Sequence, residues 1–154
     1  TVSMEGSRAI ILEVQALVCE TTFPNPKRSA TGFDTNRLNM LLALLEKKLD
    51  LPFNHYDVFI NISGGIKIKE SSADLAVIAA IISSFRDRPI SKESVFIGEV
   101  SLTGEIKDVY SIDLRLKEAQ AQGIKKAIIA QKTNLKLDLK TFAVDEVSKV
   151  IELF

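Results

Sequence analysis

The chain is built around residues 71–85, which read SSADLAVIAAIISSF. Behind the two opening serines almost every position is apolar, so a helix formed here has no polar face to turn toward water. Ser71 and Asp74, three residues apart, resemble the capping box that begins many helices. The pattern therefore predicts a central buried helix over residues 75–85, around which the remaining elements pack.

Periodic apolar residues predict strands and a helix on the amino-terminal side of this segment. The expected strands are residues 2–5 and 8–18, which flank a tight turn at Gly6 and Ser7, then residues 56–62 and a short strand at 66–68. Residues 20–32 hold two prolines and a glycine without a period, which predicts a long loop. Asp34 is placed to cap a helix running to about Leu49, because leucines recur there at spacings of three and four.

The carboxy-terminal side mixes helices and strands in the same way. The expected elements are a hairpin of residues 95–102 and 105–109 about Thr103 and Gly104, a helix over 111–122 closed by Gly123, strands at 126–130 and 141–144, and a last helix capped by Asp145. The sequence contains no repeat, low-complexity tract or internal linker. Residues 1–154 are therefore expected to form a single α+β domain, with a mixed sheet packed with helices.

The composition is that of a folded domain, with 46% apolar and 26% charged residues. Twenty basic residues balance twenty acidic ones, which excludes a strongly basic nucleic-acid module. A Cys/His metal site is excluded because the chain has one cysteine, Cys19, and one histidine, His55. We expect a cytoplasmic protein without a membrane partner, since no apolar run approaches the roughly 20 residues that span a bilayer and no signal peptide is evident. The chain opens at Thr1 without a methionine, and we expect it to be a piece of a longer protein.

Three motifs follow one another in an informative order. They are Ser72–Ala76 at the start of the apolar helix, Gly98–Gly104 in the second hairpin, and Gly123–Ala127, where a helix ends and a strand begins. This succession resembles the proteolytic domain of Lon over roughly residues 55–130. The resemblance implies a Lon proteolytic-domain-like fold, of the type of domain 2 of ribosomal protein S5, in which Ser72 stands at the place of the Lon nucleophile.

A closer resemblance covers the whole chain. It is carried by separated motifs at residues 4–8 with 13–18, 30–38, 57–61, 83–89 and 96–100. Together they are similar to the carboxy-terminal Lon-like domain of the RadA (Sms) family of bacterial DNA repair proteins. The resemblance implies a hexameric, DNA-dependent ATPase or helicase of recombinational repair, which acts on single-stranded or branched DNA and meets a recombinase filament through the full-length protein.

The same resemblance places the cofactors elsewhere. It implies that ATP, Mg and Zn are bound by upstream zinc-finger and RecA-like ATPase domains, while this domain itself holds no cofactor and no metal. Neither a G-x-x-x-x-G-K-[ST] phosphate loop nor a cysteine quartet occurs in the sequence. We therefore expect a carboxy-terminal fragment from which both upstream domains are absent.

Peptidase chemistry of the Lon type needs a lysine amine within hydrogen-bond reach of the serine hydroxyl. Counted back from Gly123, the place of the Lon lysine falls on Asp113, whose carboxylate cannot serve as that amine. Lys107 and Lys117 are the nearest alternatives, and both are displaced by more than catalytic geometry tolerates. We therefore expect this domain not to be an enzyme, with a residual serine peptidase using Ser72 and an unassigned base as the alternative.

Basic residues mark possible contacts with DNA and with other subunits. The candidates for DNA contact are Lys27, Arg28, Arg37, Lys47 and Lys48. Arg86, Asp87 and Arg88 are expected to form an ion-pair cluster or a subunit contact, because a carboxylate lies between the two arginines. The leading hypothesis is a noncatalytic domain that supports a six-membered ring and lines part of the DNA path. A purely structural oligomerisation module is a further alternative.

Overall fold

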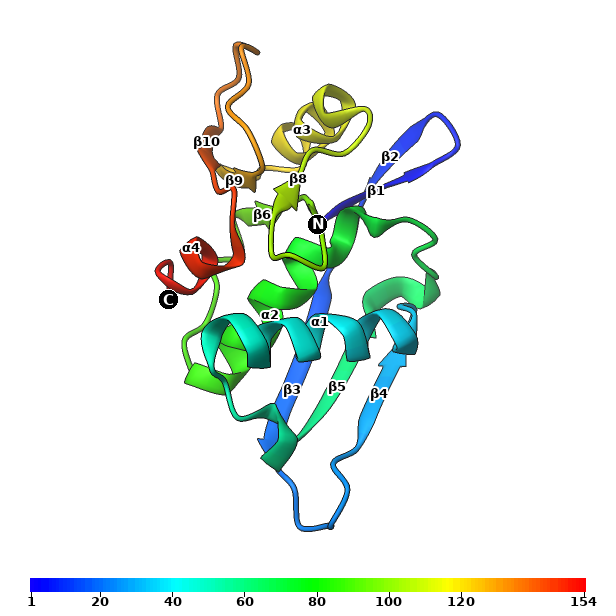
Figure 1. Cartoon of the computed structure of the whole chain (residues 1–154). Helices are drawn as coiled ribbons and strands as arrows, with labels where there is room; N and C mark the ends of the chain where they lie inside the picture. The colour runs from blue at the N-terminus through cyan, green and yellow to red at the C-terminus, as the bar shows by residue number, and fades with distance from the viewer.

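The computed structural model describes residues 1–154. One part of the molecule is a three-stranded sheet in which β5 (Tyr56–Ile62) lies between antiparallel β3 (Val14–Glu20) and parallel β4 (Arg28–Thr31). The helices α1 (Thr35–Leu49) and α2 (Asp74–Arg86) lie on one side of this sheet (Figure 1). The other face is open to solvent, and Leu17 in β3 is 58% exposed there.

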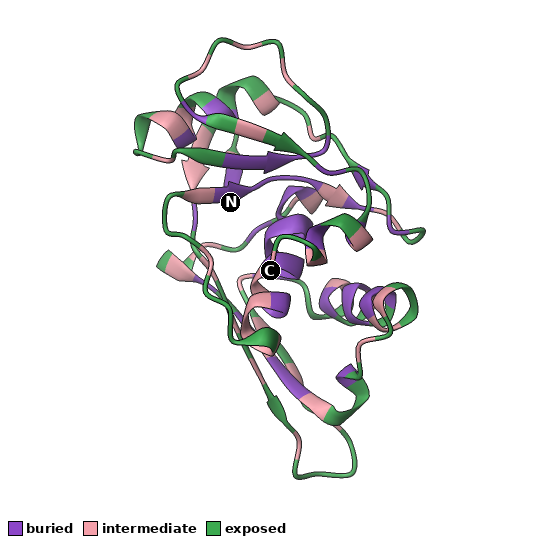
Figure 2. Cartoon of the chain, turned by 90° about the vertical axis from the view of Figure 1, so that its left-hand side faces the viewer, coloured by how far each residue is buried: buried purple, intermediate pink, exposed green.

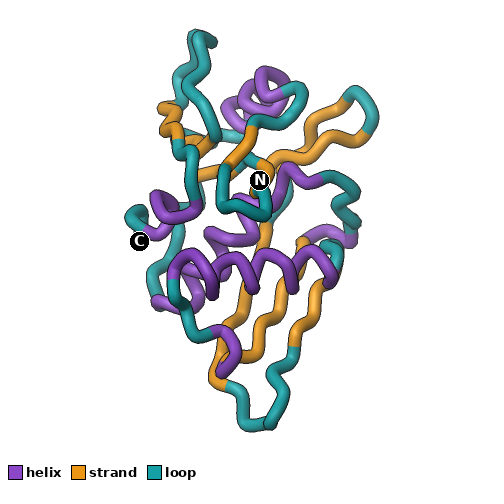
Figure 3. Tube along the Cα trace, in the orientation of Figure 1, coloured by secondary structure: helices purple, strands orange, loops and turns teal.

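The second part of the molecule is a parallel sheet of three strands in the order β10-β9-β6 (Figure 3). Its strands are β6 (Ser94–Phe96), β9 (Lys126–Ile129) and β10 (Lys140–Ala143). The other elements are the hairpins β1 (Val2–Glu5) with β2 (Arg8–Ile11) and β7 (Glu99–Val100) with β8 (Ile106–Lys107), the helices α3 (Ile112–Ala121) and α4 (Val147–Ile151), and the 3-10 turns η1 (Phe53–His55), η2 (Ser63–Gly65) and η3 (Ser71–Ala73). The predicted α+β class is confirmed.

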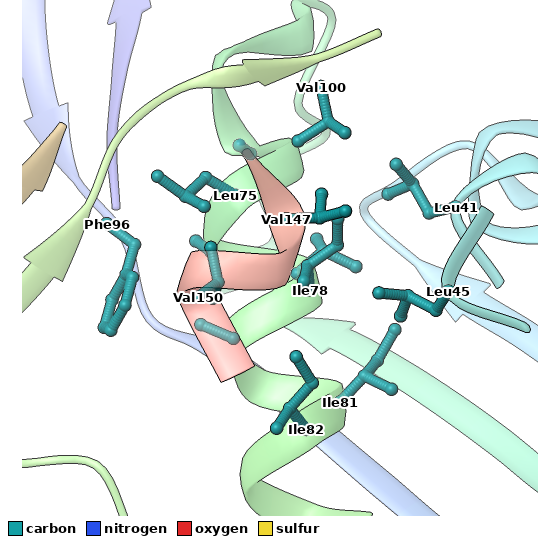
Figure 4. Packing of buried hydrophobic residues seen from close by; sticks show 14 of the residues in the cluster. Leu41, Leu45, Leu75, Ile78, Ile81, Ile82, Phe96, Val100, Val147 and Val150 are labelled. Atoms are coloured by element: carbon teal, nitrogen blue, oxygen red, sulfur yellow. The ribbon is translucent and has the colours of Figure 1, made fainter. Parts of the chain in front are cut away.

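The helix α2 lies at the centre of the molecule, as its sequence predicts. Leu75 and Ile78 are fully buried in a cluster of 28 apolar residues to which both parts of the molecule contribute. Figure 4 shows Val147 and Val150 of α4, and Leu41 of α1, converging on this helix. Figure 2 shows buried segments in the helices at the centre of the molecule and in strands of both sheets. Each buried aliphatic side chain contributes roughly 1.5–3 kcal/mol, so this cluster is the main source of stability.

The structure divides two segments that the sequence predicts as single strands. Residues 8–18 form β2 and β3, which belong to different sheets, because pairing with β1 ends at Ile11 and pairing with β5 begins at Val14. Residues 95–102 likewise divide into β6, which pairs with β9, and β7, which pairs with β8. At each break, one continuous stretch of chain therefore contributes strands to two different sheets.

The connection predicted as one long loop is partly a strand. Residues 28–31 within the segment 20–32 pair in parallel with β5, so only the first part of that segment is irregular. The short strand predicted at 66–68 is wrong. Ile68 donates its N–H to the carbonyl oxygen of Gly32 at 2.8 Å, and this bond is not part of a strand ladder.

Two predicted helix ends are confirmed and two are wrong. The carboxylate of Asp34 accepts a first-turn backbone N–H of α1 at 3.0 Å, and Gly123 follows α3 with φ at +87°. The capping box at Ser71 is wrong, because η3 leads into α2 and no side chain caps that helix. Asp145 also makes no cap for α4. Its carboxylate pairs with a lysine four residues later at 2.6 Å.

Candidate functional site

The turn that holds Ser72 brings together the first two of the three motifs in the sequence. The carbonyl oxygen of Ser72 accepts the N–H of Gly98 at 3.0 Å, and the carbonyl oxygen of Gly98 accepts the N–H of Leu75 at 3.1 Å. Ser72 is 2% exposed. Its hydroxyl donates to Oε1 of Glu70 at 2.6 Å, so this serine is oriented by a carboxylate two residues earlier.

Glu70 is the centre of a hydrogen-bonded group that we call the Glu70 cluster. Its members are Glu70, Ser72, Arg115, Ser3 and the backbone N–H of Met4. Arg115 is 0% exposed and binds the carboxylate through two nitrogens, with Nη1 to Oε1 at 2.6 Å and Nη2 to Oε2 at 2.9 Å. The same Nη1 donates to the carbonyl oxygen of Val2 at 2.8 Å. Three separate stretches of chain, β1, the Ser72 turn and α3, therefore meet at one carboxylate.

The electrostatics of the cluster keep this carboxylate ionised. Burial by itself raises the pKa of Glu70, but the hydrogen bonds from Arg115, Ser72 and Met4 outweigh burial and lower the pKa to about 2. A carboxylate with so low a pKa is a weak proton acceptor near neutral pH. Glu70 is therefore suited to holding the Ser72 hydroxyl in place and poorly suited to activating it as a nucleophile.

Of the chain's charged groups, Arg115 is the one that reaches the Ser72 turn from α3. Asp113, which the motif order predicts at the place of the Lon lysine, is exposed in the first turn of that helix. Arg115 follows two residues later and points inward to Glu70. Lys107 and Lys117 are both exposed, and neither forms a hydrogen bond with Ser72. The sequence analysis does not predict the roles of Glu70 and Arg115. The one sequence feature that could have indicated them is that Arg115 occupies a position on the apolar side of its helix.

A second buried charge lies just beyond Ser72. Asp74 is 0% exposed and accepts two hydrogen bonds from the guanidinium of Arg37, with Nε at 2.6 Å, and one from the N–H of Val100 at 3.0 Å. Burial raises the pKa of Asp74, and the contacts with Arg37 and Val100 act in the opposite direction. The hydrogen bond with Asp74 raises the pKa of Arg37. Arg37, a candidate for DNA contact, is thus used to join α1 to α2.

The structure separates the candidate DNA contacts into projecting and inward cations. Lys27 is exposed, and its ammonium lies 4.4 Å from the centre of the Phe23 ring. Lys47 and Lys48 are exposed in the last turn of α1. The side chain of Arg28 is only 17% exposed and donates to a carbonyl oxygen of η1 at 2.7 Å. The residues free to reach a phosphate are therefore the three lysines.

The segment Arg86–Arg88 ends α2 on the surface. Asp87 adopts a left-handed conformation with φ at +51°, and its N–H closes the last turn of the helix. Arg86 donates to the carbonyl oxygen of Ile151 at 3.4 Å, and none of the three side chains takes part in an ion pair. The predicted ion-pair cluster is therefore wrong within one chain, and a role for these residues as a subunit contact stays a prediction.

Metal and membrane sites are not found in the structure. The chain has no group of three or more His, Cys, Asp or Glu side chains positioned to hold a metal ion. No helix combines the length and apolar character that a bilayer crossing requires.

Comparisons with known proteins identify the relatives of this chain. A family model described as subunit ChlI of Mg-chelatase matches residues 32–133. DNA repair protein RadA of Campylobacter jejuni is 62% identical over 151 residues, which cover 98% of this chain and 33% of that protein. DNA repair protein RadA of Helicobacter pylori strain 26695 is 55% identical, covering 99% of this chain and 34% of that protein.

A more distant relative matches in the same way. DNA repair protein RadA of Bacillus subtilis is 48% identical over 129 residues, which cover 84% of this chain and 28% of that protein. The chain spans about a third of the length of the curated relatives it matches first. It therefore belongs to the family described as subunit ChlI of Mg-chelatase, and its relatives are the bacterial RadA DNA repair proteins.

Proposed function

We propose that this chain is the noncatalytic, Lon-like domain of a RadA-type DNA-dependent ATPase or helicase in recombinational DNA repair. In this role it supports assembly of a hexameric ring and contributes to DNA binding. ATP hydrolysis, with Mg, and the zinc finger belong to other domains of the full-length protein. The observation that carries the proposal is the 62% identity to DNA repair protein RadA over 98% of this chain.

The geometry about Ser72 supports the noncatalytic part of the proposal. A serine peptidase needs an exposed hydroxyl and a base poised to take its proton. Ser72 is 2% exposed and donates to a carboxylate that accepts further donors from Arg115 and Ser3. We propose that the Glu70 cluster replaces a catalytic Ser-Lys pair with a structural contact.

Three projecting lysines support the DNA-binding part. Lys27 extends from the connection between β3 and β4, while Lys47 and Lys48 extend from the end of α1. A single weak cationic site gains strongly in avidity when a ring presents several copies to one strand of DNA. A chain with zero net charge would thus still hold DNA through local cations.

The proposal is tested by measuring how DNA affinity depends on salt. Fluorescence anisotropy of a labelled duplex is recorded with the 154-residue chain over a series of KCl concentrations. We expect affinity to fall as salt rises, because each phosphate contact of a duplex contributes a slope of about −0.9 in log affinity against log salt. The triple variant Lys27→Gln, Lys47→Gln, Lys48→Gln should flatten that slope by up to about 2.7.

A variant that removes two lysines from another region of the surface provides the control. Lys107→Gln with Lys117→Gln removes exposed charge from the region of β8 and α3, and it should leave the slope nearly unchanged. A wild-type affinity that does not respond to salt would remove the nucleic-acid role from this domain. Equal flattening per lysine removed in both variants would show that total charge is responsible and that the three lysines are not a site.

A further inference from the structure

The most cationic segment of the chain lies outside the candidate contacts described above. Residues 125–140 contain five lysines and one acidic residue, Asp138, in a chain whose net charge is zero. One of these lysines, Lys125, is paired with Glu93 at 2.7 Å. The other four lysines form no ion pair and are exposed. Their charge is thus free to act on a partner outside the chain.

Strand pairing places two of these lysines side by side. β10 is the outer strand of its sheet and pairs with β9 in parallel, so that Lys140 lies directly opposite Lys126. Neighbouring strands are about 4.8 Å apart, and paired residues share one face of a sheet. In Figure 1 the connection between the two strands extends past α3 at one end of the molecule. Both lysines are exposed, so a ligand can reach this strand pair.

An aromatic ring completes the arrangement. Phe142 lies two residues after Lys140 on the same outer strand and is 42% exposed. The ammonium of Lys126 lies 5.0 Å from the centre of its ring. Cations beside an exposed ring are the combination by which proteins hold single strands, because phosphates contact the cations and an unpaired base stacks on the ring.

We propose that Lys126, Lys140 and Phe142, which we call the β10 edge, bind single-stranded nucleic acid. The inference rests on the proposed DNA-binding function and adds to it a second surface and a preferred form of ligand. In a duplex the faces of the bases are covered by stacking on neighbouring base pairs, so Phe142 distinguishes a single strand from a duplex. The lysines supply affinity that does not depend on sequence.

Two other roles fit exposed lysines on an outer strand. Lysines on such strands prevent unwanted pairing with another sheet, and they also attract acidic proteins. Neither role needs an exposed ring beneath a lysine ammonium. Phe142 therefore favours the nucleic acid, and the experiment below separates the three cases.

The test compares a labelled oligothymidylate with a labelled duplex in anisotropy titrations across salt. Lys126→Gln with Lys140→Gln should weaken binding of the single strand and reduce the salt slope by about 1.4, since each single-strand phosphate contact contributes about 0.7. Phe142→Leu keeps an apolar side chain but removes the aromatic face. It should weaken single-strand binding by roughly tenfold, leave the salt slope unchanged, and affect the duplex much less.

Further variants and a competitor distinguish binding of single-stranded nucleic acid from the alternatives. The triple variant at Lys27, Lys47 and Lys48 should retain the preference for the single strand. If the wild-type chain binds DNA but the β10-edge variants bind the single strand equally well, the inference fails and the proposed function stands. Absence of salt-dependent binding to either DNA overturns both. If polyglutamate of equal charge competes as well as oligothymidylate, the surface is one for acidic proteins and the inference is wrong.

Discussion

At the residue scale, the most consequential group is the pair formed by buried Arg115 and half-buried Glu70. Removing two charges from water is costly, and good geometry is needed to offset it. Here the guanidinium meets the carboxylate through two hydrogen bonds and uses two of its other three donors on carbonyl oxygens of Val2 and Tyr110. The pair therefore holds the start of the chain, the Ser72 turn and α3 in one arrangement.

Replacing Glu70 should be far more damaging than replacing an exposed acid. Glu70→Leu leaves the guanidinium of Arg115 buried without its anion, and we expect a loss of about 3–5 kcal/mol in the free energy of unfolding. Glu93→Leu breaks an exposed pair of similar length, 2.7 Å, and should cost less than about 1 kcal/mol. Urea denaturation of both variants measures the difference. Equal losses would contradict a structural role for the Glu70 cluster.

Sequence patterns predict the position of Ser72 but not its surroundings. The position of the serine is predicted by a local motif of a few residues at the start of an apolar helix. Glu70 and Arg115 are 45 residues apart, and no period in the sequence joins them. The contact between Arg37 and Asp74, which are 37 residues apart, could not be predicted for the same reason. The assignment of Arg37 as a DNA contact stays a prediction. Long-range charge pairing is specified by the folded chain and not by spacing.

At the element scale, the junction between β4 and α1 depends on Gly32. Its φ is +80°, and a Cβ placed there would lie 2.6 Å from the carbonyl oxygen of Ile66 and 2.7 Å from Cβ of Ile62. The same residue accepts the N–H of Ile68 through its carbonyl oxygen. The segment after β5 therefore packs tightly over this turn, which fixes where α1 begins.

Comparing substitutions of Gly32 and Gly123 should separate the cost of steric crowding from the cost of backbone strain. Gly123 also has a positive φ, +87°, but a Cβ there would meet nothing within 4 Å. Gly123→Ala should cost about 1–2 kcal/mol for the left-handed conformation alone. Gly32→Ala should cost a further 1–3 kcal/mol or so, because backbone and side-chain atoms must move. Thermal and urea unfolding measure both losses, and equal losses would show that the junction has room for a side chain.

The sequence predicts helices better than strand boundaries in this chain. The helices over residues 35–49 and 74–86 follow from apolar periods longer than ten residues. The strands are two to seven residues long, so the same alternation of apolar residues is compatible with one long strand or with two short ones. The break between β2 and β3 depends on which partner each half finds, and that choice is made by tertiary pairing. The Lon-like fold stays a prediction from motif order.

At the scale of the whole molecule, α2 lies in the large core that both parts share, and one part has a second, smaller core of its own. The second cluster, of eight buried residues, lies between α3 and the parallel sheet. The exposed surfaces differ as well, because one part carries an open sheet face and the other carries the lysine-rich connection of β9 and β10. The two parts of the chain therefore present two different kinds of exposed surface.

Assembly into a ring is expected to depend on the end of α2. Arg86→Glu with Arg88→Glu reverses two exposed charges that make no ion pair within the chain. If this end contacts a neighbouring subunit, the hexamer should dissociate while the unfolding midpoint of the chain stays the same. Sedimentation velocity measures the mass of the assembly. Lys107→Glu with Lys117→Glu serves as the comparison, and a hexamer that survives both pairs of substitutions would exclude this contact.

The Glu70 cluster also has a mechanical consequence. A tensile load applied at Thr1 enters β1, where Val2 and Met4 are bound through their backbone to Arg115 and Glu70. We expect the load to pass into α3 and into the turn before α2, because these hydrogen bonds must break before the first hairpin can open. A force applied to the beginning of the chain would thus be transmitted directly to the buried core.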